Sequence, residues 1–382
     1  MRKNILIIGA GVTGAIVARE LAVNGYHVTV FDKRQHTAGN CYTKTDPQTG
    51  ILVHEYGPHI FHTDNTTVWN YVNEFADFAP YICQVKATTQ GKVFSLPINL
   101  LTINQFFNKT FSPQEAKDFI ESISEPIEPV KSFEDQALRF LGRDLYEAFF
   151  RGYPLKQWGM DPSLLPASIL KRLPVRFNYN DNYFNHQYQG IPREGYTTMV
   201  DRILAHENIT VHLNRDFNAA EEHGFDHVFY TGPLDSWFQH RAGRLGYRTL
   251  RFERSHHAGD FQGCAVMSYP EEKVPFTRIT EHKYFTPWKN FENTVIFHEY
   301  SSYCGKDDDP YYPIRLVEEE KVISNYVEMA DQEKGVTFMG RLATYRYMDM
   351  DVAIAEALQA AGEFIKLDRQ AQNIPVFFNR PI

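Results

Sequence analysis

The N-terminal segment switches between two apolar patterns, one typical of a buried strand and one typical of a helix. Residues 5–8 form a continuous apolar run, which favours a strand buried in a parallel sheet. Apolar residues then recur at helical spacing over 16–21, and Gly25 is placed to end that helix. Residues 27–31 return to a strand pattern. The segment therefore predicts a strand–helix–strand unit and an α/β fold.

Later segments have patterns of their own. From about residue 100 to 171, an apolar stripe at helical spacing predicts helices. From 248 to 300, short β-prone runs separated by turns predict an antiparallel sheet. An alanine-rich stretch over 351–365 predicts a closing helix, and the acidic run 306–310 is expected to be a short solvated loop.

Composition narrows the class of protein. The 382-residue chain is 43% apolar and 23% charged, which indicates a globular protein of two or three domains. Its net charge of −8 includes no basic block, so we expect no nucleic-acid partner. The four cysteines lack metal-ligand spacing, so we expect no metal and a reducing, cytoplasmic setting. We also expect no signal peptide and no membrane span, because no apolar run reaches about eighteen residues.

The turn after the first strand carries a dinucleotide-binding pattern. It reads Gly-Ala-Gly-Val-Thr-Gly over residues 9–14, and Asp32 ends the second strand. Gly9 permits the tight turn, Gly11 lets a pyrophosphate approach the backbone, and Gly14 allows close helix–strand packing. N–H groups at the helix start would bind phosphate, and Asp32 would accept from a ribose hydroxyl. The alternative is a glycine turn without a ligand, but strand, helix and acid together favour a dinucleotide.

Further motifs point to one family. A second glycine turn at 37–40, just after the second strand, resembles one that many FAD-binding oxidoreductases have near the flavin, and this resemblance favours flavin as the nucleotide cofactor. Eight segments then read YGPHIFHT at 56–63, KQWG at 156–159, KRLPVRF at 171–177, DNYF at 181–184, YQGIP at 188–192, FTRITEH at 276–282, YYP at 311–313 and GRLATYRY at 340–347. In order and spacing, the chain resembles the bacterial UDP-galactopyranose mutases over nearly its whole length.

The resemblance implies a fold with three parts. These are a Rossmann-like FAD-binding domain, an inserted helical domain and an antiparallel β-sheet domain. The FAD-binding domain is expected to be discontinuous, comprising residues 1–80, 193–240 and 336–382. The helical domain, which includes a mobile lid, is expected over 98–171. The sheet domain is expected over 81–97, 172–192 and 241–335.

The resemblance also implies a reaction. The family interconverts UDP-galactopyranose and UDP-galactofuranose with reduced FAD, whose N5 nitrogen forms a covalent intermediate with sugar C1. Arg172 and Arg278 match arginines that bind the diphosphate and stabilise the departing nucleotide, so we assign them a catalytic role. The expected partner is a nucleotide sugar, and the family implies a homodimer.

Two sets of site residues follow from the same resemblance. The cofactor-binding set is Gly9, Gly11, Thr13, Gly14, Asp32, Asn40, His59, Ile60, Arg341, Met350 and Asp351. The substrate-binding set is Cys83, Phe150, Tyr153, Pro154, Trp158, Arg172, Tyr183, Ser268, Arg278, Tyr312 and Tyr347. Tyrosine hydroxyls in this set are expected to bind phosphate oxygens, and the tryptophan is expected to belong to the lid.

The chain departs from the family pattern mainly in the substrate set. Cys83, Pro154 and Ser268 replace two asparagines and a threonine, which lowers hydrogen-bonding capacity. A 6-deoxy sugar such as dTDP-fucopyranose therefore stays open as the substrate. Ala38 replaces a glycine beside the flavin and is expected to keep a negative φ.

Two other function classes remain open. One is an FAD-dependent oxidoreductase of the amine oxidase type, and the other is a flavin-binding protein without catalysis. Arg172 together with Arg278 argues against both, because neither class needs a grip on a diphosphate.

Overall fold

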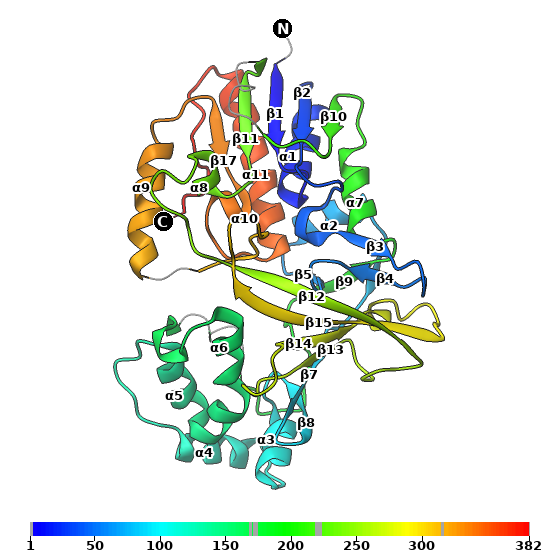
Figure 1. The fold of residues 1–382 in the computed structure, drawn as a ribbon, viewed down its shortest axis with the longest axis vertical. Coiled ribbons are helices and arrows are strands. Elements are labelled where there is room, and N and C mark those ends of the chain that lie inside the picture. The colour runs from blue at the N-terminus through cyan, green and yellow to red at the C-terminus, as the bar shows by residue number, and fades with distance from the viewer. Residues whose placement is uncertain (1–2, 168–169, 171–174, 218–223, 315–316, 382) are drawn as a thin grey trace.

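The computed structural model describes residues 3–167, 170, 175–217, 224–314 and 317–381. A parallel sheet with flanking helices lies at one end of the molecule, and a group of helices lies at the other (Figure 1). A long twisted strand pair crosses between them. Both ends of the chain contribute to the parallel sheet, in blue and orange in Figure 1.

The parallel sheet joins strands that are far apart in sequence. Ile5 lies beside Val28 on one side and His227 on the other. Ile5, Leu6 and Ile7 are fully buried, and each such side chain stabilises the fold by about 1.5–3 kcal/mol. In spatial order the strands are β10 (Ile209–His212), β2 (His27–Phe31), β1 (Asn4–Ile8), β11 (His227–Tyr230) and β17 (Val336–Phe338).

Helices cover both faces of the parallel sheet, namely α1 (Val12–Val23), α7 (Gly195–Leu204), α8 (Leu234–Trp237), α9 (Val317–Ala330) and α11 (Met350–Arg369). Ile5 and Ile7 face a core shared with α1, α7 and α11. Leu6 faces the opposite core, which includes Tyr326 of α9. We expected 241–335 to belong to the second sheet, but α9 buries its apolar residues against the parallel sheet instead.

The predicted helices between residues 100 and 171 form a unit of their own. They are α3 (Leu100–Phe107), α4 (Pro113–Ile123), α5 (Phe133–Leu145), a π turn (Tyr146–Phe150) and α6 (Gly152–Trp158). Capping boxes start α4 and α5, formed by Ser112 with Glu115 and by Ser132 with Asp135. The apolar stripe of α5 lies in the core of this unit.

The second sheet contains the long strand pair. Strands β12 (Tyr247–Ala258) and β15 (Asn293–Tyr303) pair antiparallel from Arg248 opposite Tyr303 to Ala258 opposite Asn293. β13 pairs with β7 in parallel, so the sheet is mixed, although most of its pairs are antiparallel as predicted. In spatial order the strands are β16 (Tyr312–Pro313), β12 (Tyr247–Ala258), β15 (Asn293–Tyr303), β14 (Arg278–Glu281), β13 (Val266–Ser268), β7 (Val85–Thr89) and β8 (Lys92–Leu96).

Shorter elements complete the fold, among them a two-stranded and a three-stranded sheet. They are β3 (Thr43–Thr45), β4 (Leu52–His54), β5 (Phe61–Thr63), β6 (Phe78–Pro80), β9 (Tyr188–Pro192), α2 (Thr66–Asn73), α10 (Gly340–Ala343) and 3₁₀ turns at Gly39–Cys41, Pro162–Leu164 and His282–Phe285. All four cysteines are free thiols. Within the described ranges, no helix is both long and apolar enough to cross a bilayer. Nor does that part of the chain hold three His, Cys, Asp or Glu side chains grouped as metal ligands.

Candidate active site

The glycine turn between β1 and α1 leaves its backbone open to a ligand. Gly9 has a φ of +109°, and a Cβ there would lie 2.1 Å from Thr231 Oγ1. A Cβ on Gly14 would lie 2.0 Å from the Gly9 carbonyl oxygen, so helix and strand pack directly together. A Cβ on Gly11 would meet nothing closer than 3.9 Å. The N–H end of α1 is therefore accessible at Gly11, as a phosphate requires.

Asp32 organises this turn from the end of β2. Its carboxylate accepts from the N–H groups of Ala10 and Arg34, each at 2.8 Å, and the side chain is buried. Each carboxylate oxygen has a second lone pair. Asp32 therefore holds the turn in shape and keeps acceptor capacity for the ribose hydroxyl that we expect there.

The second turn packs on the first and corrects one expectation. Ala38 has a φ of +68°, in the left-handed region, where we expected a negative value. Its N–H donates to the Ala10 carbonyl at 2.9 Å, and Ala38 pairs with Gly11 in an isolated bridge. The left-handed conformation costs about 1–2 kcal/mol of free energy. The pairing between the two turns fixes the backbone in this conformation and offsets that cost.

Arg34 connects the second turn to the acidic loop. Its Nη1 donates to Asn40 Oδ1 at 2.9 Å, and its Nη2 lies 3.1 Å from Asp309 Oδ2. Lys33 Nζ lies 3.4 Å from the other oxygen of Asp309. Burial would raise the pKa of Asp309, but the two cations outweigh burial and lower it. The run 306–310 is thus anchored to the nucleotide turn by Asp309, whereas we expected only a solvated loop.

Arg341 brings unpaired buried donors to the region around the predicted cofactor-binding residues, which we call the cofactor side. Its Nε and Nη2 atoms are buried and have no hydrogen-bond partner in the described chain. Its guanidinium carbon lies 4.9 Å from the ring centroid of Tyr312 and 4.6 Å from that of Tyr347. A Cβ on the preceding Gly340 would lie 3.2 Å from Thr13 Oγ1 of α1, so Arg341 begins beside the glycine turn. An unpaired buried donor costs about 1–3 kcal/mol, so this site suits a ligand with acceptor atoms.

His59 is close enough to both Arg341 and Arg278 for their charges to affect it. It therefore lies between the cofactor side and the region around the predicted substrate-binding residues, which we call the substrate side. Burial lowers its pKa to about 4, against the effect of its bond to the Gly57 carbonyl, and the charges of Arg341 and Arg278 lower it further. The neutral ring donates from Nδ1 to the Gly57 oxygen at 2.8 Å. A Cβ on Gly57 would lie 3.7 Å from Arg278 Nη2. The next residue, Ile60, packs on the core that contains Cys83, a substrate-set residue.

The start of α11 completes the cofactor side. Cys41 Sγ lies 3.4 Å from Met350 Sδ, which joins the second turn to the helix. Thr63 Oγ1 donates to Asp351 Oδ2 at 2.9 Å, which joins β5 to the same helix. The N-terminus of α11 also carries partial positive charge. These contacts fix both predicted residues at the start of the helix.

Arg278 is the central charge of the substrate side. Its Nε donates to Glu299 Oε2 at 2.7 Å, and the two residues are direct neighbours across β14 and β15. Burial alone would lower the pKa of Arg278, but the Glu299 carboxylate raises it above its ordinary value. Its Nη groups have no hydrogen bond to any described residue, so they remain available for phosphate oxygens.

Four tyrosines gather around Arg278. Burial raises the pKa values of Tyr153, Tyr183 and Tyr312, that of Tyr183 to about 12, and the charge of Arg278 opposes this shift in all three. Tyr347 stacks on Tyr312 with centroids 5.8 Å apart. The buried hydroxyls stay protonated at neutral pH, so they are donors for an anionic ligand.

Three other substrate residues have different outcomes. Trp158 meets Tyr312 edge-on with ring centroids 6.2 Å apart, so it joins the tyrosine cluster. Phe150 is only 6% exposed and packs in the helical core, where the centroid of its ring lies 6.4 Å from that of Phe133. Arg172 lies outside the described residues.

The departures from the family pattern lie beside this cluster. Cys83 is buried, which raises its pKa to about 12, and the charge of Arg278 acts on its thiol. Ser268 is directly opposite Arg278 in the β13–β14 pair. Pro154 is buried in α6 next to Tyr153. The three replaced positions therefore adjoin the residues expected to bind substrate.

Sequence reasoning missed Glu299, although a signal was present. In β15, Val295, Phe297 and Glu299 occupy alternate positions and are all nearly fully buried. Residues two apart in a strand share a face, so an acid in this series requires a buried partner. Arg278 is that partner, and Glu299 fixes the orientation of its guanidinium.

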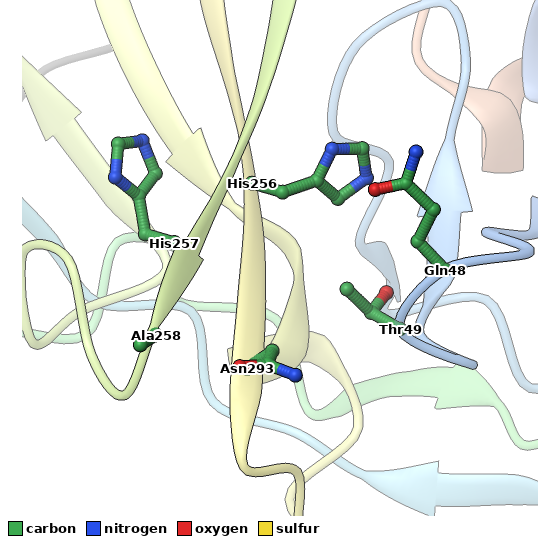
Figure 2. Close-up of a pocket in the computed structure, with 6 residues that line it drawn as sticks. All are labelled: Gln48, Thr49, His256, His257, Ala258 and Asn293. Carbon is green, nitrogen blue, oxygen red and sulfur yellow. The ribbon is translucent and has the colours of Figure 1, made fainter.

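A cavity of about 280 Å³ lies elsewhere, at the far end of the strand pair (Figure 2). It is lined by Gln48, Thr49, His256, His257, Ala258 and Asn293. None of these residues belongs to either predicted set. Asp46, close to Gln48 in the sequence, is already bonded to His256 and Thr49.

Comparison with known proteins defines the class. Fold and sequence comparison together describe an enzyme with a Rossmann-like nucleotide-binding domain. A family model described as NAD(P)-binding Rossmann-like domain matches residues 7–75, and the one described as UDP-galactopyranose mutase matches 148–347. The chain belongs to the UDP-galactopyranose mutase family.

Individual relatives agree with this assignment. A probable UDP-galactopyranose mutase from Klebsiella pneumoniae is 58% identical over 98% of both chains. A dTDP-fucopyranose mutase from Escherichia coli is 50% identical over 96% of this chain and 100% of its own. A crystal structure of reduced UDP-galactopyranose mutase shares the fold, with a TM-score of 0.72 at 15% identity over 96% of each chain.

Proposed function

We propose that the protein is an FAD-dependent mutase that interconverts UDP-galactopyranose and UDP-galactofuranose. The observation that carries the proposal is the position of Arg278. It is paired with Glu299 and lies near three protonated tyrosines, and its charge, like that of Arg341 on the cofactor side, lowers the pKa of His59. A nucleotide diphosphate bound at Arg278 would therefore hold its sugar beside the cofactor.

The cofactor side fits FAD. The accessible N–H end of α1 at Gly11 would bind the pyrophosphate, and Asp32 would accept from the ribose. The unpaired Nε and Nη2 of Arg341 would donate to flavin acceptor atoms, and its charge would favour the anionic reduced form. When bound and reduced, FAD supplies a nucleophile for the anomeric carbon while the ring opens and closes.

The residues of the substrate side have separate tasks. Arg278, with Arg172 as expected from its motif, would neutralise the charge that develops on the departing UDP. Tyrosine hydroxyls would donate to the same phosphate oxygens, since burial keeps them protonated. Glu299 would keep the guanidinium in place without binding substrate.

Product analysis tests this proposal. Protein with bound FAD should convert UDP-galactofuranose to UDP-galactopyranose in the presence of dithionite, and should do so poorly without this reductant. Chromatography of the nucleotide sugars measures the conversion. Oxygen consumption with a panel of amines is the contrasting assay. Amine oxidation without conversion of the nucleotide sugar would replace the mutase by the oxidoreductase class.

A dTDP-fucopyranose mutase is the second function to test. The observation that favours it is the position of Cys83 and Ser268 next to Arg278, where fewer polar groups remain to satisfy sugar hydroxyls. The relative of that activity is 50% identical, against 58% for the probable UDP-galactopyranose mutase, so UDP-galactose leads.

A further inference from the structure

Lys156 is a charged side chain of α6 whose partners are main-chain carbonyls. Its Nζ donates to the carbonyl oxygens of Tyr269, Glu271, Val274 and Phe276, the last three at 2.9, 3.0 and 3.0 Å. An ammonium has three N–H donors, so four carbonyls saturate it. Burial lowers its pKa to about 8, so the group is still mainly charged at neutral pH.

These carbonyls belong to the connection between two substrate-side strands. Residues 269–277 join β13, which ends at Ser268, to β14, which begins at Arg278. Tyr153 lies three residues before Lys156, and its pKa responds to the charge of Arg278. Lys156 therefore ties the helix that carries Tyr153 to the connection that leads into Arg278.

Arg248 of β12 holds the C-terminal end of α6. It is 5% exposed, and it donates from Nε to the Gln157 carbonyl at 2.8 Å and from Nη2 to the Lys156 carbonyl at 3.1 Å. Gly159, with a φ of +68°, ends the helix, and a Cβ there would lie 2.6 Å from Arg248 Nη1. β12 thus fixes the C-terminus of α6, and Lys156 adds the hydrogen bonds that attach the helix to the β13–β14 connection.

We propose that Lys156 is a positioning residue for the nucleotide-sugar site, which sets Tyr153 relative to Arg278 by locking α6 to the β13–β14 connection. The proposal rests on the proposed function for the nature of the ligand, a uridine diphosphate bound by both side chains. A ligand that contacts two segments at once is bound tightly only if those segments already have the correct relative position before the ligand arrives.

Lys156→Met removes the ammonium and keeps the length of the side chain. We expect KM for UDP-galactopyranose and Kd for UDP each to rise at least about fivefold, because coupled neighbouring groups interact by this order. kcat should stay within about threefold, since binding of ground and transition states is weakened alike. FAD content should not change. The matched control is Lys273→Met, which removes an exposed lysine of the same connection that pairs only with Glu271 at 3.2 Å.

Two further measurements keep the test decisive. In a Tyr153→Phe background, Lys156→Met should raise Kd for UDP less than about twofold, because its effect acts through Tyr153. In the unaltered holoenzyme, UDP should slow amide hydrogen exchange in 152–158 and 269–277 together. Any of three results would overturn the proposal. They are full additivity of the two substitutions in their effect on Kd for UDP, an unchanged Kd for UDP in Lys156→Met, and slowed hydrogen exchange in one of the two segments alone. UDP binding needs no turnover, so a wild-type enzyme inactive on UDP-galactopyranose would refute the proposed function without deciding the role of Lys156.

Discussion

The glycine turn at 9–14 and the group of tyrosines around Arg278 are expected to bind their ligands through different parts of the chain. In the turn, Gly9, Gly11 and Gly14 present backbone, so binding there would depend on the absence of side chains. Around Arg278, binding would depend on side chains brought together from separate segments. The first region should therefore fail through steric conflict and the second through loss of charge, so substitutions can separate cofactor binding from catalysis.

The largest effect is expected from Gly14→Val. Its Cβ would lie 2.0 Å from the Gly9 carbonyl oxygen, so α1 and β1 cannot keep their spacing. We expect loss of bound FAD, measured by absorbance of the purified protein, and loss of all activity. The matched control is Gly362→Ala in α11, where a Cβ meets no atom within 4 Å. This control should retain FAD and gain about 0.5–1 kcal/mol in stability. Normal FAD content in Gly14→Val would remove the turn from the cofactor site.

Arg278→Ala should separate the two regions. We expect kcat/KM to fall by about 100-fold or more, since removing one group that stabilises transition-state charge costs roughly 2.7–4 kcal/mol. FAD content should be unchanged. Because Ala leaves Glu299 buried without its partner, Arg278→Ala with Glu299→Gln distinguishes lost catalysis from lost stability. Near-wild-type kinetics in either protein would contradict the assignment.

We expect two buried histidines, His54 and His282, to make the stability of the fold depend on pH. Burial lowers the pKa of His282 to about 3 and that of His54 well below 6.5, and neither ring nitrogen of His282 has a partner in the described chain. In the unfolded chain these rings bind protons below about pH 6.5. The unfolded state therefore holds more protons as the pH falls from 6.5 towards 3, and stability decreases.

His282→Phe tests this. Urea unfolding between pH 6 and 4 should show a slope smaller by about 1.4 kcal/mol per pH unit than in the wild type, because one proton fewer is taken up. Above pH 7 the two slopes should agree. Equal slopes at acid pH would mean that His282 is protonated in the folded protein.

The smallest expected effect concerns the sugar. With Cys83 and Ser268 beside Arg278, we expect kcat/KM for dTDP-fucopyranose to lie within about tenfold of that for UDP-galactopyranose, since strong preference for the extra hydroxyl requires polar groups that bind it, and fewer remain here. Both substrates are compared under identical reducing conditions. A preference for UDP-galactose larger than tenfold would mean that other groups compensate for the replaced residues.

The two regions also differ in how far the sequence predicted them. β1, α1 and β2 follow from local patterns, and the glycine turn lies within one such unit, so its role could be predicted directly. The sign of φ at Ala38 could not, because pairing with Gly11 sets it. Most substrate residues came from motif resemblance, and the apolar pattern alone did not bring them together.

Other features depend on contacts that have no sequence signature. Lys156 binds carbonyl oxygens, which every residue possesses, so nothing in its motif marks it. The packing of α9 on the parallel sheet depends on which of two apolar surfaces is nearer in the folded chain. Glu299 was predictable in principle, since an acid on the buried face of a strand implies a cationic partner.

The most direct test of the account replaces FAD by its 5-deaza analogue, which lacks the N5 nucleophile, in otherwise unchanged protein. Conversion of UDP-galactofuranose is then measured with both cofactors fully reduced. The account predicts rapid conversion with FAD and none above background with the analogue, while UDP affinity stays the same because Arg278 and the tyrosines bind it. Equal conversion with the two cofactors would contradict the account.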